Sequence, residues 1–295
     1  MPRTTSGHSL GVLRYRLLLG PVLIFLAVAA FAGDQWLGTL RIGDTPLPPG
    51  LVLGPAIVLM LGFAAWELSR ILRDNEVHSS TAASVTAMLA GFLSTIASGV
   101  GEPAVATAAV VVLLIGLAVF AKGRTFEGVV ASAGGVLLVF VYLGVLGGFW
   151  LLLRFDHSAW ICLWVVLVTK SCDIGAFFVG RRFGRHKLAP WLSPGKTQEG
   201  LIGGVVFAGF VAAAGIAALA SAGLEVPLSP VGAFFVGTAI GLLAQAGDLI
   251  ASLFKRDAGR KDASQSLPGF GGWLDVLDSP LLVGVVAYWS LRLLG

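Results

Sequence analysis

Acidic and basic residues border apolar segments in two stretches of this chain, and both stretches contain residue types that bind phosphate and metal ions. The first stretch runs from Lys170 and Asp173 to Ser-Pro-Gly-Lys-Thr at 193–197. The second begins with Gln-Ala-Gly-Asp at 245–248 and ends with Pro-Gly-Phe-Gly-Gly-Trp-Leu-Asp-Val-Leu-Asp at 268–278. Ionisable groups are costly beside a membrane span, so they indicate a functional site by default.

Three carboxylates of the second stretch could converge on a divalent cation. Asp248 lies about two helical turns before Lys255, inside an apolar segment, where an unpaired carboxylate costs about 3 kcal/mol. Asp275 and Asp278 are three residues apart and share a helix face if the last span begins near them. Mg²⁺ is usually held by one or two carboxylates and substrate phosphates. Alternatively, Asp275 and Asp278 cap the last helix, which leaves Asp248 unexplained.

Ser193, Lys196 and Thr197 look like the end of a phosphate-binding loop. A Walker A loop needs a glycine five residues before the glycine of Gly-Lys-Thr, and that position is Pro190. The sequence therefore excludes a P-loop. A short Gly-Lys-Thr loop that opens a helix can still hold phosphate through backbone N–H groups, the lysine and the hydroxyl.

The composition indicates a membrane protein. Of the 295 residues, 56% are hydrophobic and 12% are charged, and the mean hydropathy is +0.89. A soluble domain has about 25% charged residues. Cys162 and Cys172 are ten positions apart in one apolar segment, about 15 Å along a helix, so we expect no disulfide.

Nine apolar stretches have nearly the ~20 residues that a bilayer core requires. We therefore predict an all-α, polytopic integral membrane protein with about nine transmembrane helices. The expected spans are 15–33, 51–68, 82–98, 104–121, 128–153, 159–180, 200–222, 231–254 and 279–294.

The basic residues predict the orientation. With a cytoplasmic N-terminus, all Lys and Arg except Arg41, Arg154, Arg292 and Lys170 fall on the cytoplasmic side, which is 16 of 20. Lys170 lies within a span, where it could pair with Asp173. Both motif regions then face the cytoplasm. The basic residues are scattered over several short loops, so we expect no nucleic-acid binding.

The N-terminal segment has a second interpretation. Arg14 and Arg16 precede an apolar run and Ala-Phe-Ala at 30–32, as in a cleavable signal peptide. The first span of a polytopic protein has the same features, and we favour the span. Cleavage would leave both motif regions intact.

Together the motifs resemble those of the phosphatidate cytidylyltransferases, the CDP-diacylglycerol synthases. The family signature S-x-x-K-R-x4-K-D, followed by P-G-H-G-G-x-x-D-R-x-D, is similar to residues 252–262 and 268–278. An Asp in a span followed by Ser-Pro-x-Lys-Thr-x-Glu-Gly matches Asp173 and 193–200, and Gly-Asp-Leu matches 247–249. The resemblance covers about residues 165–282. Phe270 replaces the family histidine, and Val276 replaces the arginine.

The resemblance implies that CTP and phosphatidate react to give CDP-diacylglycerol and pyrophosphate at the cytoplasmic face of the inner membrane. It implies Mg²⁺ as cofactor, and leaves a second metal ion and a homodimer open. Residues 159–295 would form the catalytic region, and residues 1–158 would anchor the protein and line a lipid entrance.

The resemblance also assigns roles to residues. The expected catalytic residues are Asp248, Lys255 and Asp275. The expected metal ligands are Asp173, Asp248, Asp275 and Asp278. The residues expected to bind phosphate groups are Ser193, Lys196, Thr197, Lys255, Arg256 and Lys261.

Two other classes of protein could use the same residues. A CTP-dependent lipid or polyprenol kinase needs a similar nucleotide and metal site, but releases CDP where a cytidylyltransferase releases pyrophosphate. An ion-coupled membrane transporter could use Lys170, Asp173 and Asp248 as a relay. The sequence shows no inverted repeat with matching broken helices, which argues against a transporter.

Overall fold

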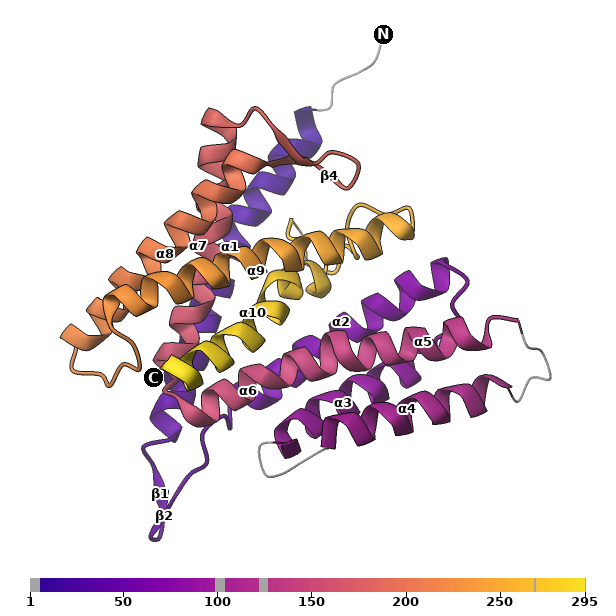
Figure 1. Ribbon diagram of the computed structural model, residues 1–295, viewed down its shortest axis with the longest axis horizontal. Helices are drawn as coiled ribbons and strands as arrows, with labels where there is room; N and C mark the ends of the chain where they lie inside the picture. Colours follow the sequence, from indigo (N-terminus) through magenta and orange to yellow (C-terminus); the bar gives the residue numbers. More distant parts are fainter. Residues whose placement is uncertain (1–5, 99–103, 122–126, 268, 295) are drawn as a thin grey trace.

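Helices form the body of the protein (Figure 1). The computed structural model describes the backbone of residues 6–98, 104–121, 127–267 and 269–294, and side chains from residue 20 onward. Within these ranges, nine helical segments are long and apolar enough to cross a membrane. This confirms the predicted all-α polytopic fold. The cytoplasmic N-terminus stays a prediction, and Pro268 of the signature lies outside the described residues.

The helices follow the expected spans, with two small hairpins between them. The helices are α1 (Ser6–Leu37), α2 (Leu53–Asp74), α3 (Thr81–Ser98), α4 (Ala104–Ala121), α5 (Val129–Val139), the π-helical η1 (Phe140–Val145), α6 (Leu146–Asp156), α7 (Ala159–Phe183), α8 (Gln198–Ser221), α9 (Pro230–Asp257) and α10 (Trp273–Leu294). The antiparallel hairpins are β1 (Arg41–Ile42) with β2 (Thr45–Pro46), and β3 (Lys187–Ala189) with β4 (Ser193–Thr197). Segments α5, η1 and α6 together form one span.

Several helices extend beyond the apolar stretches and carry motif residues. The last helix begins at Trp273 and not near residue 279, so Asp275 and Asp278 lie in its first two turns. Residues 193–197 form strand β4, where the sequence predicted a loop, and α8 starts directly after it as expected. The polar motifs are therefore built on regular elements.

Helices α9 and α10 lie between two groups of helices. Figure 1 shows α1, α7 and α8 on one side and α2 to α6 on the other. Helix α9 packs against α8 and α10, and α10 packs against α2 and α6. The two C-terminal helices therefore contact both halves of the chain.

Small residues allow the helices of the C-terminal half to approach closely. A Cβ added at Gly204 of α8 would lie 2.6 Å from the Cys172 carbonyl oxygen of α7. A Cβ added at Gly237 of α9 would lie 2.3 Å from the Ala212 Cβ of α8. Such close backbone packing is typical of helices in lipid. Both cysteines are free, as expected.

At the end of the bundle opposite the motif regions, Asp34 ties α1 to α2 and α6. Its buried carboxylate accepts hydrogen bonds from the Val52 and Leu53 N–H groups at 2.8 and 3.1 Å, and so caps α2. It also forms a 2.6 Å ion pair with Arg154 of α6. This pair was not predicted from the sequence, and it fixes the far end of the bundle.

Candidate functional site

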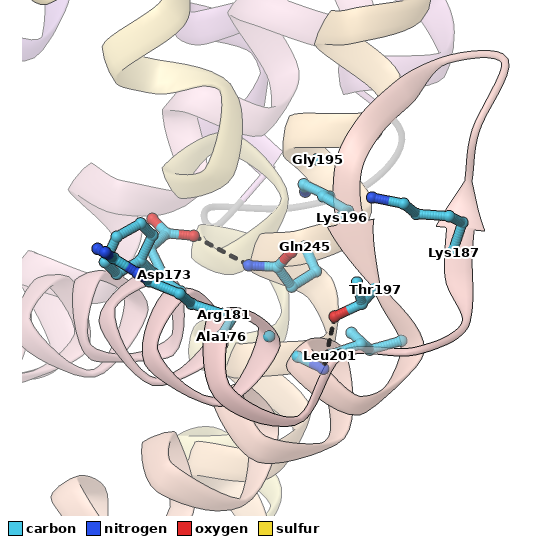
Figure 2. Close-up of a pocket in the computed structure, with 13 residues that line it drawn as sticks. Asp173, Ala176, Arg181, Lys187, Gly195, Lys196, Thr197, Leu201 and Gln245 are labelled. Atoms are coloured by element: carbon cyan, nitrogen blue, oxygen red, sulfur yellow. Dashed lines mark hydrogen bonds between the residues drawn. The ribbon is translucent and has the colours of Figure 1, made fainter.

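A cleft of ≈ 500 Å³ lies between α7, α8, α9 and the β3–β4 hairpin (Figure 2). Its wall contains three cationic side chains, from Arg181, Lys187 and Lys196. In the same wall, the Gln245 amide Nε2 donates a 2.9 Å hydrogen bond to the Asp173 Oδ1. The cleft is therefore mainly cationic, with polar groups that can orient a ligand.

Thr197 lies in the cleft wall at the start of α8. Its hydroxyl oxygen accepts a hydrogen bond from the Gly200 N–H at 3.1 Å, which is an N-cap (Figure 2). Its side chain also lines the cleft. The predicted role of Thr197 in phosphate binding is untested, and the structure adds a structural role.

An ion pair connects the hairpin to α9. The Lys196 Nζ lies 2.6 Å from the Asp248 Oδ2, and both side chains are partly buried. Asp248 does not line the cleft itself, but Lys196 does. The two motif regions, 52 positions apart in sequence, therefore meet at this pair.

The alternative pairing within α7 is not formed. In the described part of the chain, Lys170 makes no ion pair with Asp173, whose carboxylate binds Gln245. Lys170 still acts electrostatically on the carboxylates of Asp173 and Asp278. Its positive charge therefore acts on two carboxylates.

Asp248 of α9 and Asp278 of α10 form an acidic pair. The two helices are in contact there, and each carboxyl group acts electrostatically on the other. Gly247 permits this approach, because a Cβ there would lie 2.4 Å from the Asp278 carbonyl oxygen. One oxygen of Asp278 accepts a 2.6 Å hydrogen bond from the Ser279 N–H. Two like charges held this close favour a shared proton or a cation.

Asp275 faces a different set of partners. Its Oδ1 lies 2.6 Å from the buried Lys255 Nζ, and its Oδ2 accepts hydrogen bonds from the Ala263 and Gly272 N–H groups at 2.9 and 2.8 Å. The bond to Gly272 reaches back over the first turn of α10, as in a capping box. The capping interpretation therefore holds for Asp275, whereas Asp278 binds the adjacent Ser279 inside the helix.

Four predicted phosphate ligands lie outside the cleft wall, and one of them is Lys255, which pairs with Asp275. The Arg256 guanidinium donates to the Leu192 carbonyl at 3.3 Å, which fastens the end of α9 to the hairpin. Lys261 is exposed between α9 and α10, and Ser193 is half-buried at the start of β4. Their predicted roles are untested.

The acidic residues do not form one cluster. Among the described residues, no group of three or more His, Cys, Asp or Glu side chains is arranged to hold a metal ion. Asp275 is engaged with Lys255 and two backbone N–H groups, whereas Asp248 and Asp278 act electrostatically on each other. Two carboxylates with substrate phosphates are a usual ligand set of Mg²⁺, so this pair fits the ion.

Glu67 of α2 is a part of the site that was not predicted from the sequence. It is fully buried. Its carboxylate accepts hydrogen bonds from the Ser264 hydroxyl at 2.6 Å and from the Ser266 hydroxyl. It also accepts from the N–H groups of Trp273 and Leu274 at 3.1 and 2.8 Å, the first residues of α10. A residue of the N-terminal half thus holds the signature segment and caps α10.

We expect Glu67→Gln to loosen the segment 263–274. Whichever way the new amide is turned, its NH2 group faces a backbone N–H of α10, at a cost of about 1–3 kcal/mol. Hydrogen exchange of peptides spanning 263–274 should become faster, with little change in α3 and α4. Glu225→Gln, at an exposed position between α8 and α9, is the control. Unchanged exchange in Glu67→Gln would show that the carboxylate is dispensable.

The fold and site describe a polytopic membrane protein with a cationic cleft beside an acidic pair. The sequence model of the cytidylyltransferase family matches residues 37–294. The chain therefore belongs to the cytidylyltransferase family, which confirms the resemblance seen in its motifs.

Individual relatives agree with this family. The chain is 40% identical over 134 residues to the phosphatidate cytidylyltransferase of Haemophilus influenzae, which covers 45% of this chain and 46% of that enzyme. It is 32% identical over 199 residues to the phosphatidate cytidylyltransferase of Bacillus subtilis, covering 67% and 71%. The uncharacterized protein YnbB of Escherichia coli is 37% identical over 147 residues, covering 48% and 47%. The chain thus spans about half the length of two of these three relatives.

Proposed function

We propose that this protein transfers a cytidylyl group from CTP to phosphatidate, giving CDP-diacylglycerol and pyrophosphate in phospholipid biosynthesis. The observation that carries the proposal is the Lys196–Asp248 pair, which joins a cationic cleft to the Asp248–Asp278 acidic pair in a chain of this family. The relatives named phosphatidate cytidylyltransferase support the choice of substrates.

The cleft suits the triphosphate of CTP. Lys187, Lys196 and Arg181 supply positive charge from the hairpin and α7. An arginine can bind phosphate through two parallel hydrogen bonds, and lysines act as mobile point charges. Asp173 and Gln245 can orient the rest of the nucleotide by hydrogen bonds. Lys255 pairs with Asp275, and its positive charge also acts on the carboxylates of the acidic pair.

In the reaction, an oxygen of the phosphatidate phosphate attacks the α-phosphorus of CTP. A new O–P bond forms as the bond from the α-phosphorus to the bridging oxygen breaks, and pyrophosphate departs with that oxygen. A phosphate monoester is already largely ionised at neutral pH, so this nucleophile needs little help from a base. This explains how Phe270 can stand where the family has histidine.

The main obstacle is repulsion between two polyanions. We assign Asp248 and Asp278 as the residues that would hold Mg²⁺, with Asp173 beside them. When bound, the ion would neutralise charge that develops on the phosphate oxygens. If all side chains are ionised, four carboxylates face Lys170, Lys196 and Lys255, which leaves one net negative charge for a cation to balance.

The site would face the cytoplasm. The ends of α7 and α9 and the starts of α8 and α10 fall at one membrane face if the helices alternate in direction. The positive-inside rule places that face in the cytoplasm, where nucleotides and Mg²⁺ are available. The active site then lies at the inner leaflet of the cytoplasmic membrane.

The N-terminal helices would line a lipid entrance. An apolar groove of ≈ 530 Å³ runs between α2 and α3, lined by Val58, Leu59, Gly62, Phe63, Trp66, Val85, Met88 and Leu89. Phe63 stacks on Trp273 at the start of α10, with ring centroids 5.4 Å apart. The exposed Arg70 guanidinium lies 5.1 Å from the Trp66 ring centroid and could attract an anionic headgroup. We assign the groove to an acyl chain of phosphatidate.

Filling the groove should raise the KM for long-chain phosphatidate. A Cβ added at Gly62 meets no atom within 4 Å, so Gly62→Phe can place its ring in the groove without a backbone clash. Displacing two methylene groups costs about 1.6 kcal/mol, or roughly 15-fold in affinity. The KM for CTP and for dihexanoyl phosphatidate should not change. Gly134→Phe, at an exposed glycine of α5 with equal room, is the control. An unchanged KM for the long-chain lipid in Gly62→Phe would reject the assignment.

The products test the proposed reaction. Purified protein in detergent is incubated with phosphatidate, Mg²⁺ and CTP labelled at the α-phosphorus. Cytidylyl transfer moves the label into the lipid and releases unlabelled pyrophosphate. A kinase would leave the label in CDP, and a transporter would form no product; either result would refute the proposal.

A further inference from the structure

The Tyr142 hydroxyl is a buried polar group without a partner in the described structure. The residue is 5% exposed, and its hydroxyl oxygen makes no hydrogen bond. Leaving such a group unsatisfied is costly, so a native structure normally supplies a partner. The hydroxyl therefore needs a partner other than the surrounding protein atoms, such as an ordered water molecule.

Tyr142 lies where the two halves of the chain meet. It lies in the π-helical turn η1, and such turns occur frequently at functional sites. Close packing between α3 and η1 fixes this turn, since a Cβ at Gly144 would lie 2.4 Å from the Met88 carbonyl oxygen. The Tyr142 ring packs edge-on against Phe254 of α9, with centroids 5.1 Å apart.

The charged groups that act on the hydroxyl are the two members of the acidic pair. Asp278 and Asp248 both interact electrostatically with it. No direct hydrogen bond joins Tyr142 to either carboxylate, although a phenol hydroxyl is a donor suited to carboxylates. Tyr142 also belongs to the core cluster that contains Leu281 of α10 and packs against Ile250 of α9, so its side chain lies beside the helix segments that carry the pair. An ordered water molecule there could bridge the hydroxyl to a carboxylate.

We propose that Tyr142 is a positioning residue for the acidic pair, and that its hydroxyl donates a water-bridged hydrogen bond to Asp278. The bond would hold that carboxylate toward Asp248 in the geometry that binds a divalent cation. A phenol does this without adding a positive charge that would compete with the cation, as a lysine would. The inference depends on one part of the proposed function, namely that the acidic pair of Asp248 and Asp278 binds Mg²⁺.

Tyr142→Phe tests the inference, because it removes the hydroxyl and keeps the ring. Mn²⁺ binding is measured by electron paramagnetic resonance on the purified full chain, without nucleotide or lipid. Loss of a group that orients a metal ligand typically weakens metal affinity about 10- to 100-fold. The Mg²⁺ concentration for half-maximal CTP turnover should rise by the same factor, with turnover restored at saturating Mg²⁺.

The control is Tyr288→Phe, which removes a hydroxyl that contacts Arg292 elsewhere on α10. It should leave Mn²⁺ affinity unchanged. Unchanged Mn²⁺ affinity in Tyr142→Phe would overturn the inference, and so would a wild-type protein that binds no Mn²⁺. A defect confined to the KM for CTP would also overturn it, by pointing to direct substrate contact. If wild-type protein binds Mn²⁺ and Tyr142→Phe weakens it, but no cytidylyl transfer occurs, the proposed function fails and the positioning role stands.

Discussion

Replacing Asp248 with asparagine is expected to lower Mg²⁺-dependent CTP turnover by about 10²- to 10³-fold or more, while the protein still inserts in the membrane. Asparagine keeps the size of the side chain and removes its charge. Lys196 then loses its 2.6 Å partner, and Asp278 loses the other half of the acidic pair. Turnover is measured with labelled CTP on protein that elutes as a single peak in detergent.

The matched control for this variant is Asp257→Asn. Asp257 lies on the same helix but is exposed, and its carboxylate accepts a 2.6 Å hydrogen bond from the Asn75 amide. It should retain nearly full turnover, because the lost bond is at the surface. Equal activity of Asp248→Asn and wild type would refute the assignment of the site.

Gly247→Ala is expected to reduce turnover strongly by separating α9 from α10. The new Cβ would lie 2.4 Å from the Asp278 carbonyl oxygen and 3.2 Å from the Ser279 Cα. Relief of the first contact requires a shift of about 1 Å, and a misplacement of that size can cost about 100-fold in rate. The overpacking itself destabilises by about 1–3 kcal/mol. Turnover and thermal stability in detergent are measured together.

Gly232→Ala separates this effect from a general effect of alanine in α9. At Gly232 an added Cβ meets no atom closer than 3.4 Å, so only ordinary contacts form. Gly232→Ala should match wild type in turnover and be equal or higher in stability, since alanine favours helix. If Gly247→Ala kept full turnover, the close approach of the helices would have no role in the reaction.

Hydrophobicity and motif spacing were enough to predict the helices and the family. Continuous apolar runs such as 104–121 can only be spanning helices, because lipid offers no partner for backbone groups. The order of the motifs around Asp173, Lys196, Asp248 and Asp275 identified the family, which the match over residues 37–294 confirms. These features are local in the chain, so a single sequence contains them.

The partners of the charged side chains could not be predicted. Asp275 was expected to lie beside Asp248, but it binds Lys255 and two backbone N–H groups. The segment before α10 points these N–H groups toward the Asp275 carboxylate. Glu67 could be noticed in the sequence as a lone carboxylate in an apolar span. Its partner, the Trp273 N–H group, is 206 positions away in the chain. Such pairings depend on how helices cross, which spacing does not encode.

Two basic side chains of the cleft were not predicted as part of the site, for a related reason. Arg181 and Lys187 were counted only as basic residues flanking a span. Their place in the cleft depends on the β3–β4 hairpin, which folds back over the end of α7. Two short strands in a polar segment leave no periodic pattern that could predict this.

The most direct test of the account is the position of a divalent cation. A structure of the purified protein determined with Mn²⁺, located by its anomalous scattering, would show where the ion binds. We predict a peak coordinated by the carboxylates of both Asp248 and Asp278, next to the Lys196 end of the cleft. A peak held elsewhere, or coordination by Asp275 without Asp248, would contradict the central claim.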